Sequence, residues 1–188
     1  MKFDAVVIGT SAGGLFALTS VFEYLPEDFR LPVIVVQHRS KDERNLLEEV
    51  LSQKCKIKIR QADEKEVIRP GTIYFAPPDY HLLIERNGTF SLTSDPKVNY
   101  SRPSIDVLFE TAAMVYKHRL LAIILTGANQ DGAAGMKLVK EFGGTTIAQE
   151  PDTAQFPAMP KAAIDTGAID YVFHLREILQ FLYEAGKN

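Results

Sequence analysis

Near its N-terminus the chain reads Ala5-Val6-Val7-Ile8-Gly9-Thr10-Ser11-Ala12-Gly13-Gly14-Leu15. A short β-branched run ends at Gly9, and apolar residues then recur at helical spacing from Leu15 to Phe22. This pattern predicts a buried parallel strand, a tight turn and the first turn of a helix. The turn places Ser11 at the carboxyl edge of a sheet and near a helix N-terminus, where free N–H groups and the helix dipole favour negative charge.

The turn Gly9-Thr10-Ser11-Ala12-Gly13 also fits G-x-S-x-G, the nucleophile elbow, in which small flanking residues leave the serine Oγ exposed. The alternative is that Ser11 only caps the following helix, because serine is a favoured N-cap residue. Two other glycine-rich loops fit less well. A dinucleotide fingerprint needs a glycine where Ser11 stands, and a P-loop needs Gly-Lys-Ser/Thr, whereas Gly14 is followed by Leu15. A nucleotide-binding domain is therefore the weaker alternative.

The composition is ordinary for a soluble globular protein, with 46% hydrophobic and 24% charged residues among 188 and a formal net charge of −3. This length fits one domain with a sizeable core. A net charge of −3 gives no basic surface of the kind that binds nucleic acid. No apolar run approaches the ~20 residues that a membrane helix needs. The N-terminus shows no signal-peptide pattern. Cys55 is the only cysteine, which excludes a disulfide framework within one chain. We therefore expect a cytoplasmic domain that neither binds nucleic acid nor inserts into membranes.

Strand and helix patterns alternate along the rest of the chain, with one antiparallel interruption. Asn87-Gly88 between strand patterns at 82–85 and 89–92 predicts a β-hairpin. Ser40 and Glu43 form a capping box before a helix, and Ser104 is placed to cap another. The alternation predicts a doubly wound, mostly parallel sheet with helices on both faces and a small antiparallel hairpin. Further strands are expected at 33–36, 56–60, 72–76, 121–125, 145–148 and 171–173, and a long proline-rich loop at 151–160.

Three polar residues stand at or just past the ends of strand patterns: Ser11, His38 and Asp131. Ligands bind beyond the carboxyl ends of the strands in open α/β sheets, so we expect these side chains to meet there. A serine nucleophile needs a base, a histidine suits that role near neutral pH, and a carboxylate can orient the imidazole. The chain order Ser-His-Asp differs from the Ser-Asp-His order of α/β hydrolases, so the elbow does not imply that fold.

Simpler roles exist for two of these residues. His38 can be a strand-end residue with satisfied hydrogen bonds, and Asp131 can cap the helix that follows it. We favour His38 as the base because only this histidine ends a buried strand that neighbours the first one in sequence. No histidine pair has metal-ligand spacing such as H-x-x-x-H, so neither a zinc site nor a cofactor is expected. The other histidines are His81, His118 and His174.

Several segments spread over nearly the whole chain occur, in this order, in one known family. They are Val7-Ile8-Gly9-Thr10-Ser11-Ala12-Gly13-Gly14, Val35-Val36-Gln37-His38, Pro70-Gly71-Thr72-Ile73-Tyr74-Phe75-Ala76-Pro77, Arg102-Pro103-Ser104-Ile105-Asp106-Val107-Leu108-Phe109, Ile124-Leu125-Thr126-Gly127, Asp131-Gly132-Ala133, Thr146-Ile147-Ala148-Gln149-Glu150, Met159-Pro160 and Ala162-Ala163-Ile164. On these segments the chain resembles the catalytic domain of the bacterial chemotaxis methylesterase (CheB) family. The resemblance implies a doubly wound parallel sheet that hydrolyses γ-glutamyl methyl esters on chemoreceptor cytoplasmic helices and releases methanol. Some members also deamidate receptor glutamines.

The resemblance also implies residue roles. The serine, histidine and aspartate of the family fall on Ser11, His38 and Asp131. The backbone N–H groups of Ala12 and Ala128 stand where the family holds an oxyanion. The implied partners are methylated chemoreceptor helices, and the resemblance implies neither a metal nor a cofactor.

The sequence departs from the family pattern beside the site. Ala12 replaces a threonine, and Ala128 and Asn129 replace Met-Gly in the usual Thr-Gly-Met-Gly. These changes keep the backbone donors, but they motivate an alternative: a catalytically silent module that binds receptor or kinase helices. Family members usually carry an N-terminal receiver domain. We expect residues 1–188 to form one catalytic domain without it, so that a receiver domain or kinase acts in trans, or the chain is a piece of a larger protein.

Overall fold

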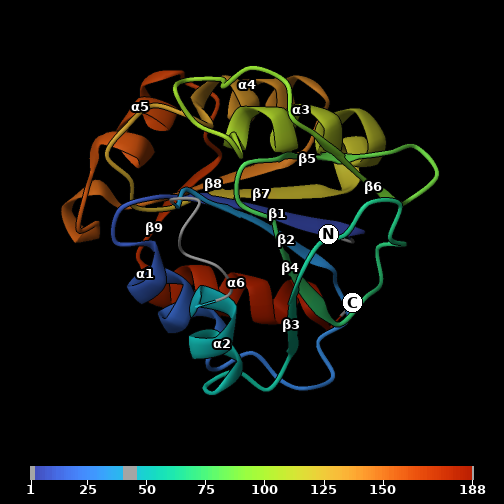
Figure 1. The fold of residues 1–188 in the computed structure, drawn as a ribbon. Helices are drawn as coiled ribbons and strands as arrows, with labels where there is room; N and C mark the ends of the chain where they lie inside the picture. The colour runs from blue at the N-terminus through green and yellow to red at the C-terminus, as the bar shows by residue number, and fades with distance from the viewer. Residues whose placement is uncertain (1–2, 40–45, 188) are drawn as a thin grey trace.

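The computed structural model describes residues 3–39 and 46–187 and has the expected α/β architecture. Within these residues, seven strands form a parallel sheet in the order β3-β4-β2-β1-β7-β8-β9, and β5 and β6 form a separate antiparallel hairpin (Figure 1). The doubly wound sheet and its hairpin are thus confirmed. The strands are β1 (Ala5–Thr10), β2 (Val33–Gln37), β3 (Lys58–Gln61), β4 (Thr72–Phe75), β5 (His81–Ile84), β6 (Phe90–Thr93), β7 (Leu120–Ile124), β8 (Thr145–Gln149) and β9 (Tyr171–Phe173).

Helices cover both faces of the sheet. In Figure 1, α1, α2 and α6 lie below it and α3, α4 and α5 lie above it. Two short 3-10 helices, Lys117–Arg119 and Pro151–Thr153, complete the elements. The helices are α1 (Gly14–Phe22), α2 (Leu46–Ser52), α3 (Ile105–Tyr116), α4 (Ala133–Glu141), α5 (Ala158–Asp165) and α6 (Leu175–Gly186).

The central strand β1 explains why its sequence is apolar without alternation. Successive side chains of a strand point to opposite faces. Val6 and Ile8 belong to the core on the α1 and α6 side, whereas Ala5 and Val7 belong to the core on the α3 and α4 side. All of these residues are fully buried. A strand buried on both faces therefore appears as a continuous apolar run.

The strand order changes direction at β1, which lies between β2 and β7. Thr10 pairs with Gln37 of β2, and Gly9 pairs with Ile124 of β7. The chain segments that leave these three strands therefore emerge side by side at the carboxyl edge of the sheet. A crevice at such a switch point is the usual ligand site of this kind of fold.

The irregular segment expected at 151–160 is shorter in the structure: Pro151–Thr153 form a 3-10 helix, and α5 begins at Ala158, inside the expected loop. Pro160 fits into the first turn of α5 because N–H groups there have no partner within the helix. The capping box formed by Ser40 and Glu43 lies outside the described residues.

Candidate active site

Backbone hydrogen bonds extend the sheet beyond the ends of its central strands. The N–H of His38 donates to the carbonyl of Thr10 at 3.1 Å, and the N–H of Ser11 donates to the carbonyl of Thr126 at 3.0 Å. These contacts hold the turn after β1 between the end of β2 and the loop after β7. The three predicted site segments are therefore adjacent.

His38 and Asp131 are in direct contact. The Nε2 of His38 lies 2.7 Å from the Oδ2 of Asp131, which is fully buried. The His38 side chain is 11% exposed, so the ring reaches the surface at one edge. Because Nε2 is engaged with the carboxylate, Nδ1 is the ring nitrogen that contacts no carboxylate.

The Asp131 carboxylate accepts hydrogen bonds from several groups besides His38. The hydroxyl of Ser104 donates to Oδ1 at 2.8 Å, and the N–H of Ile105 donates to Oδ2 at 2.7 Å. The N–H of Asp106 and the Nδ2 of Asn99 add longer contacts to Oδ1, both at 3.2 Å. Asp131 thus binds the N-terminus of α3, where backbone N–H groups and the helix dipole favour an anion.

This network changes two expectations about helix capping. Ser104 does occupy the N-cap position of α3, but its hydroxyl donates to Asp131 and caps no N–H of its own helix. Asp131 does not cap α4, which follows it, because Gly132 occupies that N-cap with a φ of 98°. A left-handed φ of this kind favours glycine. Asp131 instead serves α3 and His38.

Burial and hydrogen bonding act on Asp131 in opposite directions. Burial alone would raise the pKa of Asp131, but the hydrogen bonds from His38 and from the Ile105 N–H outweigh it and hold the pKa below its ordinary value. For the neighbouring Asp106, burial is the largest influence and raises the pKa, and the negative charge of Asp131 adds to the rise. Asn99 Nδ2 lies between them, 2.8 Å from Asp106 Oδ2. Asp131 is therefore the more readily ionised of these two carboxyl groups.

The lowered pKa of Asp131 predicts a loss of stability in acid. A carboxyl whose pKa is lower in the folded state stabilises the fold above its unfolded pKa of about 3.9, and this contribution disappears as pH falls toward the folded pKa. Between about pH 6 and about pH 3, we therefore expect the free energy of unfolding to fall more in the native chain than in Asp131→Asn. Urea denaturation of both proteins across this range measures the difference. Parallel pH curves would show that Asp131 contributes nothing to acid sensitivity.

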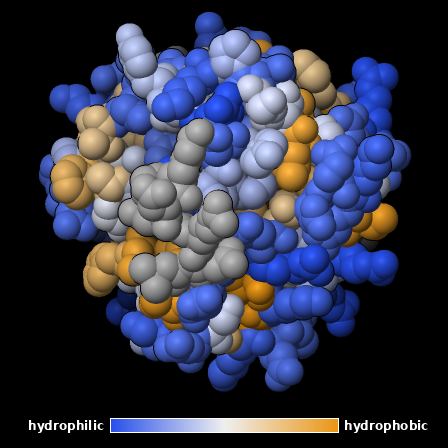
Figure 2. All heavy atoms as spheres, viewed as in Figure 1, coloured by the Kyte–Doolittle hydropathy of each residue, from blue (hydrophilic) through white to orange (hydrophobic). Residues whose placement is uncertain are grey.

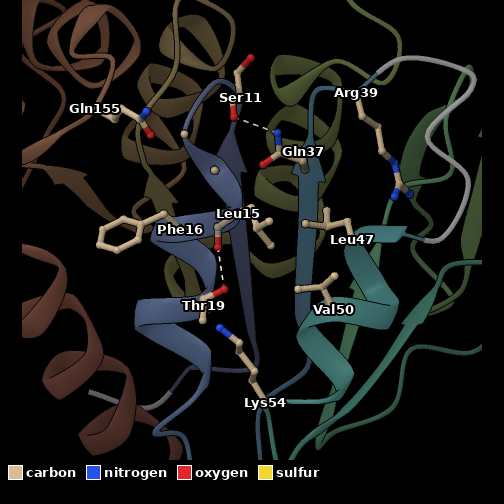
Figure 3. A pocket seen from close by; sticks show the side chains of 12 residues that line it. Ser11, Leu15, Phe16, Thr19, Gln37, Arg39, Leu47, Val50, Lys54 and Gln155 are labelled. Carbon is tan, nitrogen blue, oxygen red and sulfur yellow. Dashed lines mark hydrogen bonds between the residues drawn. The ribbon is translucent and has the colours of Figure 1, made fainter.

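Gln37 connects the two segments that carry Ser11 and His38. Its Nε2 donates to the carbonyl of Ser11 at 2.8 Å and to the carbonyl of His38 at 2.9 Å. Figure 3 shows the first of these bonds at the end of the pocket. A side chain at Gly14 would collide with this amide, since a Cβ there would lie 1.8 Å from Gln37 Oε1. Sequence reasoning missed Gln37, although its place directly before His38 was a usable signal.

The Ser11 hydroxyl has no hydrogen-bond partner among the described residues. Ser11 does not cap α1, because Gly13 occupies the N-cap with a φ of 79°. In Figure 3 its hydroxyl points away from the pocket, while its carbonyl faces Gln37. The serine is thus held through its backbone and leaves its hydroxyl unengaged.

The backbone N–H groups of Ala12 and Ala128 also lack acceptors in the described part of the chain. The segments that carry them are nevertheless fixed. The hydroxyl of Thr126 donates to the carbonyl of Ala12 at 2.9 Å, and the N–H of Gly127 donates to the carbonyl of Phe156 at 2.9 Å. Unpaired N–H groups on fixed segments are what an oxyanion site requires.

Two cavities lie beside these residues. One, of about 710 Å³, runs from Ser11 between α1 and α2 and is lined by Leu15, Phe16, Leu47 and Val50 among others (Figure 3). Figure 2 shows hydrophobic residues gathered on this side of the molecule, where Leu15 and Phe16 are exposed. The other, of about 300 Å³, is lined by His38, Arg39, Lys97, Tyr100, Ser101, Arg102 and Pro103.

Two features of the described residues limit the kinds of site available. In the ranges 3–39 and 46–187, no cluster of three or more His, Cys, Asp or Glu side chains is arranged to hold a metal ion. None of the helices in these ranges is long and apolar enough to span a bilayer.

The chain is similar to known proteins of one family. Residues 6–182 match the model of the CheB methylesterase family. The chain is 46% identical over 188 residues to a putative protein-glutamate methylesterase/protein-glutamine glutaminase of Leptospira interrogans, covering all of this chain and 97% of that protein. It is 38% identical over 182 residues to the protein-glutamate methylesterase/protein-glutamine glutaminase of Thermotoga maritima, covering 95% of this chain but 53% of that longer protein.

A solved structure supports the same assignment. The crystal structure of the Thermotoga maritima CheB methylesterase catalytic domain superimposes with a TM-score of 0.94 at 36% identity, covering 98% of this chain and 99% of that one. The resemblance seen in the sequence is thereby confirmed: the chain belongs to the CheB methylesterase family.

Proposed function

We propose that this protein is a serine-type protein-glutamate methylesterase that hydrolyses γ-glutamyl methyl esters on the cytoplasmic helices of chemoreceptors. Family membership and the names of its relatives support the reaction and the substrate class. The observation that carries the serine mechanism is the His38–Asp131 contact of 2.7 Å at the same sheet edge as the unengaged hydroxyl of Ser11.

In the proposed first step, the Nδ1 of His38 accepts the proton of Ser11 as Oγ attacks the ester carbonyl. Asp131 remains ionised, accepts the Nε2–H of His38 and stabilises the imidazolium. The N–H groups of Ala12 and Ala128 bind the oxyanion. The C–O bond to the methoxy group then breaks, and Nδ1 returns the proton to form methanol and an acyl-enzyme on Ser11.

The second step reverses these roles. His38 takes a proton from water as the water oxygen attacks the acyl carbon, and the Ser11–acyl bond breaks as Oγ recovers its proton. The product is a free glutamate side chain. The same steps convert a glutamine carboxamide to glutamate with ammonia as leaving group, and the name of the Leptospira relative supports including this deamidation in the proposal.

Methanol release from methylated chemoreceptor membranes tests the proposed function. We expect steady release with the native chain, and covalent labelling of Ser11 by a fluorophosphonate. The alternative motivated by Ala12, Ala128 and Asn129, a silent binding module, predicts stoichiometric binding to receptor helices without methanol release or labelling. Increased release on addition of a receiver domain or kinase would support control in trans.

Gln37 is expected to set the position of the nucleophile relative to the base. In Gln37→Glu both donors are lost, and a carboxylate faces the carbonyl oxygens of Ser11 and His38. Because small misplacements of reacting groups are costly, we expect kcat to fall about 10²-fold with little change in KM. Steady-state methanol release measures both constants. Gln180→Glu makes the same exchange on an exposed residue of α6 that lines neither cavity beside the site, and an equal loss there would contradict the prediction.

A further inference from the structure

The ring nitrogen of His38 that should act as the base already has neighbours. The Nδ2 of Asn129 lies 3.4 Å from Nδ1, and the hydroxyl of Ser101 lies 3.5 Å from it. The Ser11 hydroxyl, which has to deliver its proton to Nδ1, has no hydrogen bond to it. The lone pair of Nδ1 therefore faces Asn129 and Ser101 before any substrate binds.

The orientation of the Asn129 amide follows from its second contact. The N–H of Asp131 donates to the Oδ1 of Asn129 at 3.1 Å. A backbone N–H can only donate, so this atom must be the amide oxygen, and the NH₂ group must face His38. An NH₂ group has no acceptor to offer, so the contact suits an Nδ1 that accepts while Nε2 carries the proton toward Asp131.

We propose that Asn129 is a positioning residue that occupies the Nδ1 lone pair in the resting enzyme. The inference rests on the proposed function and names a residue that acts through His38. The Asn129 amide has to move away from Nδ1 before Ser11 can transfer its proton to this nitrogen. If Nδ1 carried a proton, that proton would face the hydrogens of the Asn129 NH₂ group. Asn129 thus slows the proton transfer from Ser11 to His38. A glycine, the usual residue here in the family pattern, has no side chain to do this.

Most other charged groups near the ring are already paired. Asp131 contacts Nε2, Arg39 is paired with Glu48 at 2.7 Å, and Arg102 is paired with Asp79 at 2.7 Å. Asp106 is separated from His38 by Asp131 and Asn99. Lys97 lines the cavity beside His38 and is exposed. An exchange at residue 129 changes the charge or the donor closest to Nδ1 and leaves these pairs in place.

Two variants separate this role from a structural one. A serine hydroxyl can accept the Asp131 N–H as an asparagine side chain does, but it is too short to reach Nδ1, so Asn129→Ser keeps the turn and removes the donor. We expect its kcat at neutral pH to rise roughly three- to ten-fold, which corresponds to the free energy of one weak hydrogen bond to Nδ1, with KM unchanged. Asn129→Asp keeps the turn and turns an acceptor toward Nδ1. This variant should favour the doubly protonated ring and move the acid limb of the pH–rate profile upward by about one unit or more.

Nitrogen NMR of the ¹⁵N-histidine-labelled chain gives a second readout that needs no turnover. In the neutral ring of native His38, Nδ1 should be unprotonated and Nε2 protonated, and Asn129→Asp at the same pH should show protons on both nitrogens. Gln130→Ala, an exposed exchange on the same loop, should match the native chain in both assays. Native-like kinetics and NMR in both Asn129 variants would overturn the inference. If no protein releases methanol, the proposed function fails, but the NMR result still decides the role of Asn129.

Discussion

Replacing Ser11 by alanine is expected to lower the rate of methyl-ester hydrolysis by at least about 10⁴-fold, because the members of a catalytic triad act as a unit and the acyl-enzyme cannot form without Oγ. The residual rate would come from the oxyanion donors and from substrate binding alone. The fold should not change, since the Ser11 hydroxyl has no partner among the described residues and its backbone contacts do not involve the side chain.

Methanol release, together with mass spectrometry of the intact protein during turnover, measures this effect. The native chain should accumulate a covalent adduct when a slow ester is used, and Ser11→Ala should not. Ser20→Ala removes a hydroxyl from α1 that only bonds the carbonyl of Phe16, and it should retain full activity. Hydrolysis by Ser11→Ala at the native rate would remove Ser11 from the mechanism and leave the serine-type proposal without a nucleophile.

Replacing Asp131 by asparagine is expected to reduce kcat by about 10⁴-fold, because the exchange favours the tautomer of His38 that cannot act as the base. An amide NH₂ turned toward Nε2 would make that nitrogen the acceptor and move the ring proton to Nδ1. A protonated Nδ1 cannot take the proton of Ser11. The opposite orientation of the introduced amide is also unfavourable, because it turns the NH₂ group toward the Ser104 hydroxyl and the Asp106 N–H, which donate to this position in the native chain.

The same exchange should also destabilise the fold. At least one buried donor at the N-terminus of α3 loses its acceptor, at a cost of roughly 1–3 kcal/mol. Kinetics, urea denaturation and nitrogen NMR of His38 together test both effects. Asp152→Asn, an exposed exchange in the 3-10 helix after β8, serves as the control and should change neither activity nor stability. Native kcat in Asp131→Asn would show that the His38–Asp131 contact does not orient the base.

Local sequence patterns were sufficient to predict most of the architecture. The apolar run at β1, the glycine turn and the helical spacing after it are set by neighbouring residues, as is the Asn87-Gly88 hairpin. The meeting of Ser11, His38 and the loop before Asp131 also follows from sequence, since the carboxyl ends of parallel strands lie at one edge. The loop expected at 151–160 was placed too long at its C-terminal end, because a helix tolerates Pro160 in its first turn and α5 begins at Ala158.

Tertiary structure decided which polar groups pair within the site. Asp131 binds the N-terminus of α3 rather than that of α4, Ser104 donates to Asp131, and Asn129 faces His38. Gln37 joins the carbonyls of Ser11 and His38. A sequence determines which donors and acceptors are present and on which element each stands. The choice among these partners, all but one of them 26 to 91 positions apart, depends on distances and burial that exist only once the sheet and helices have packed.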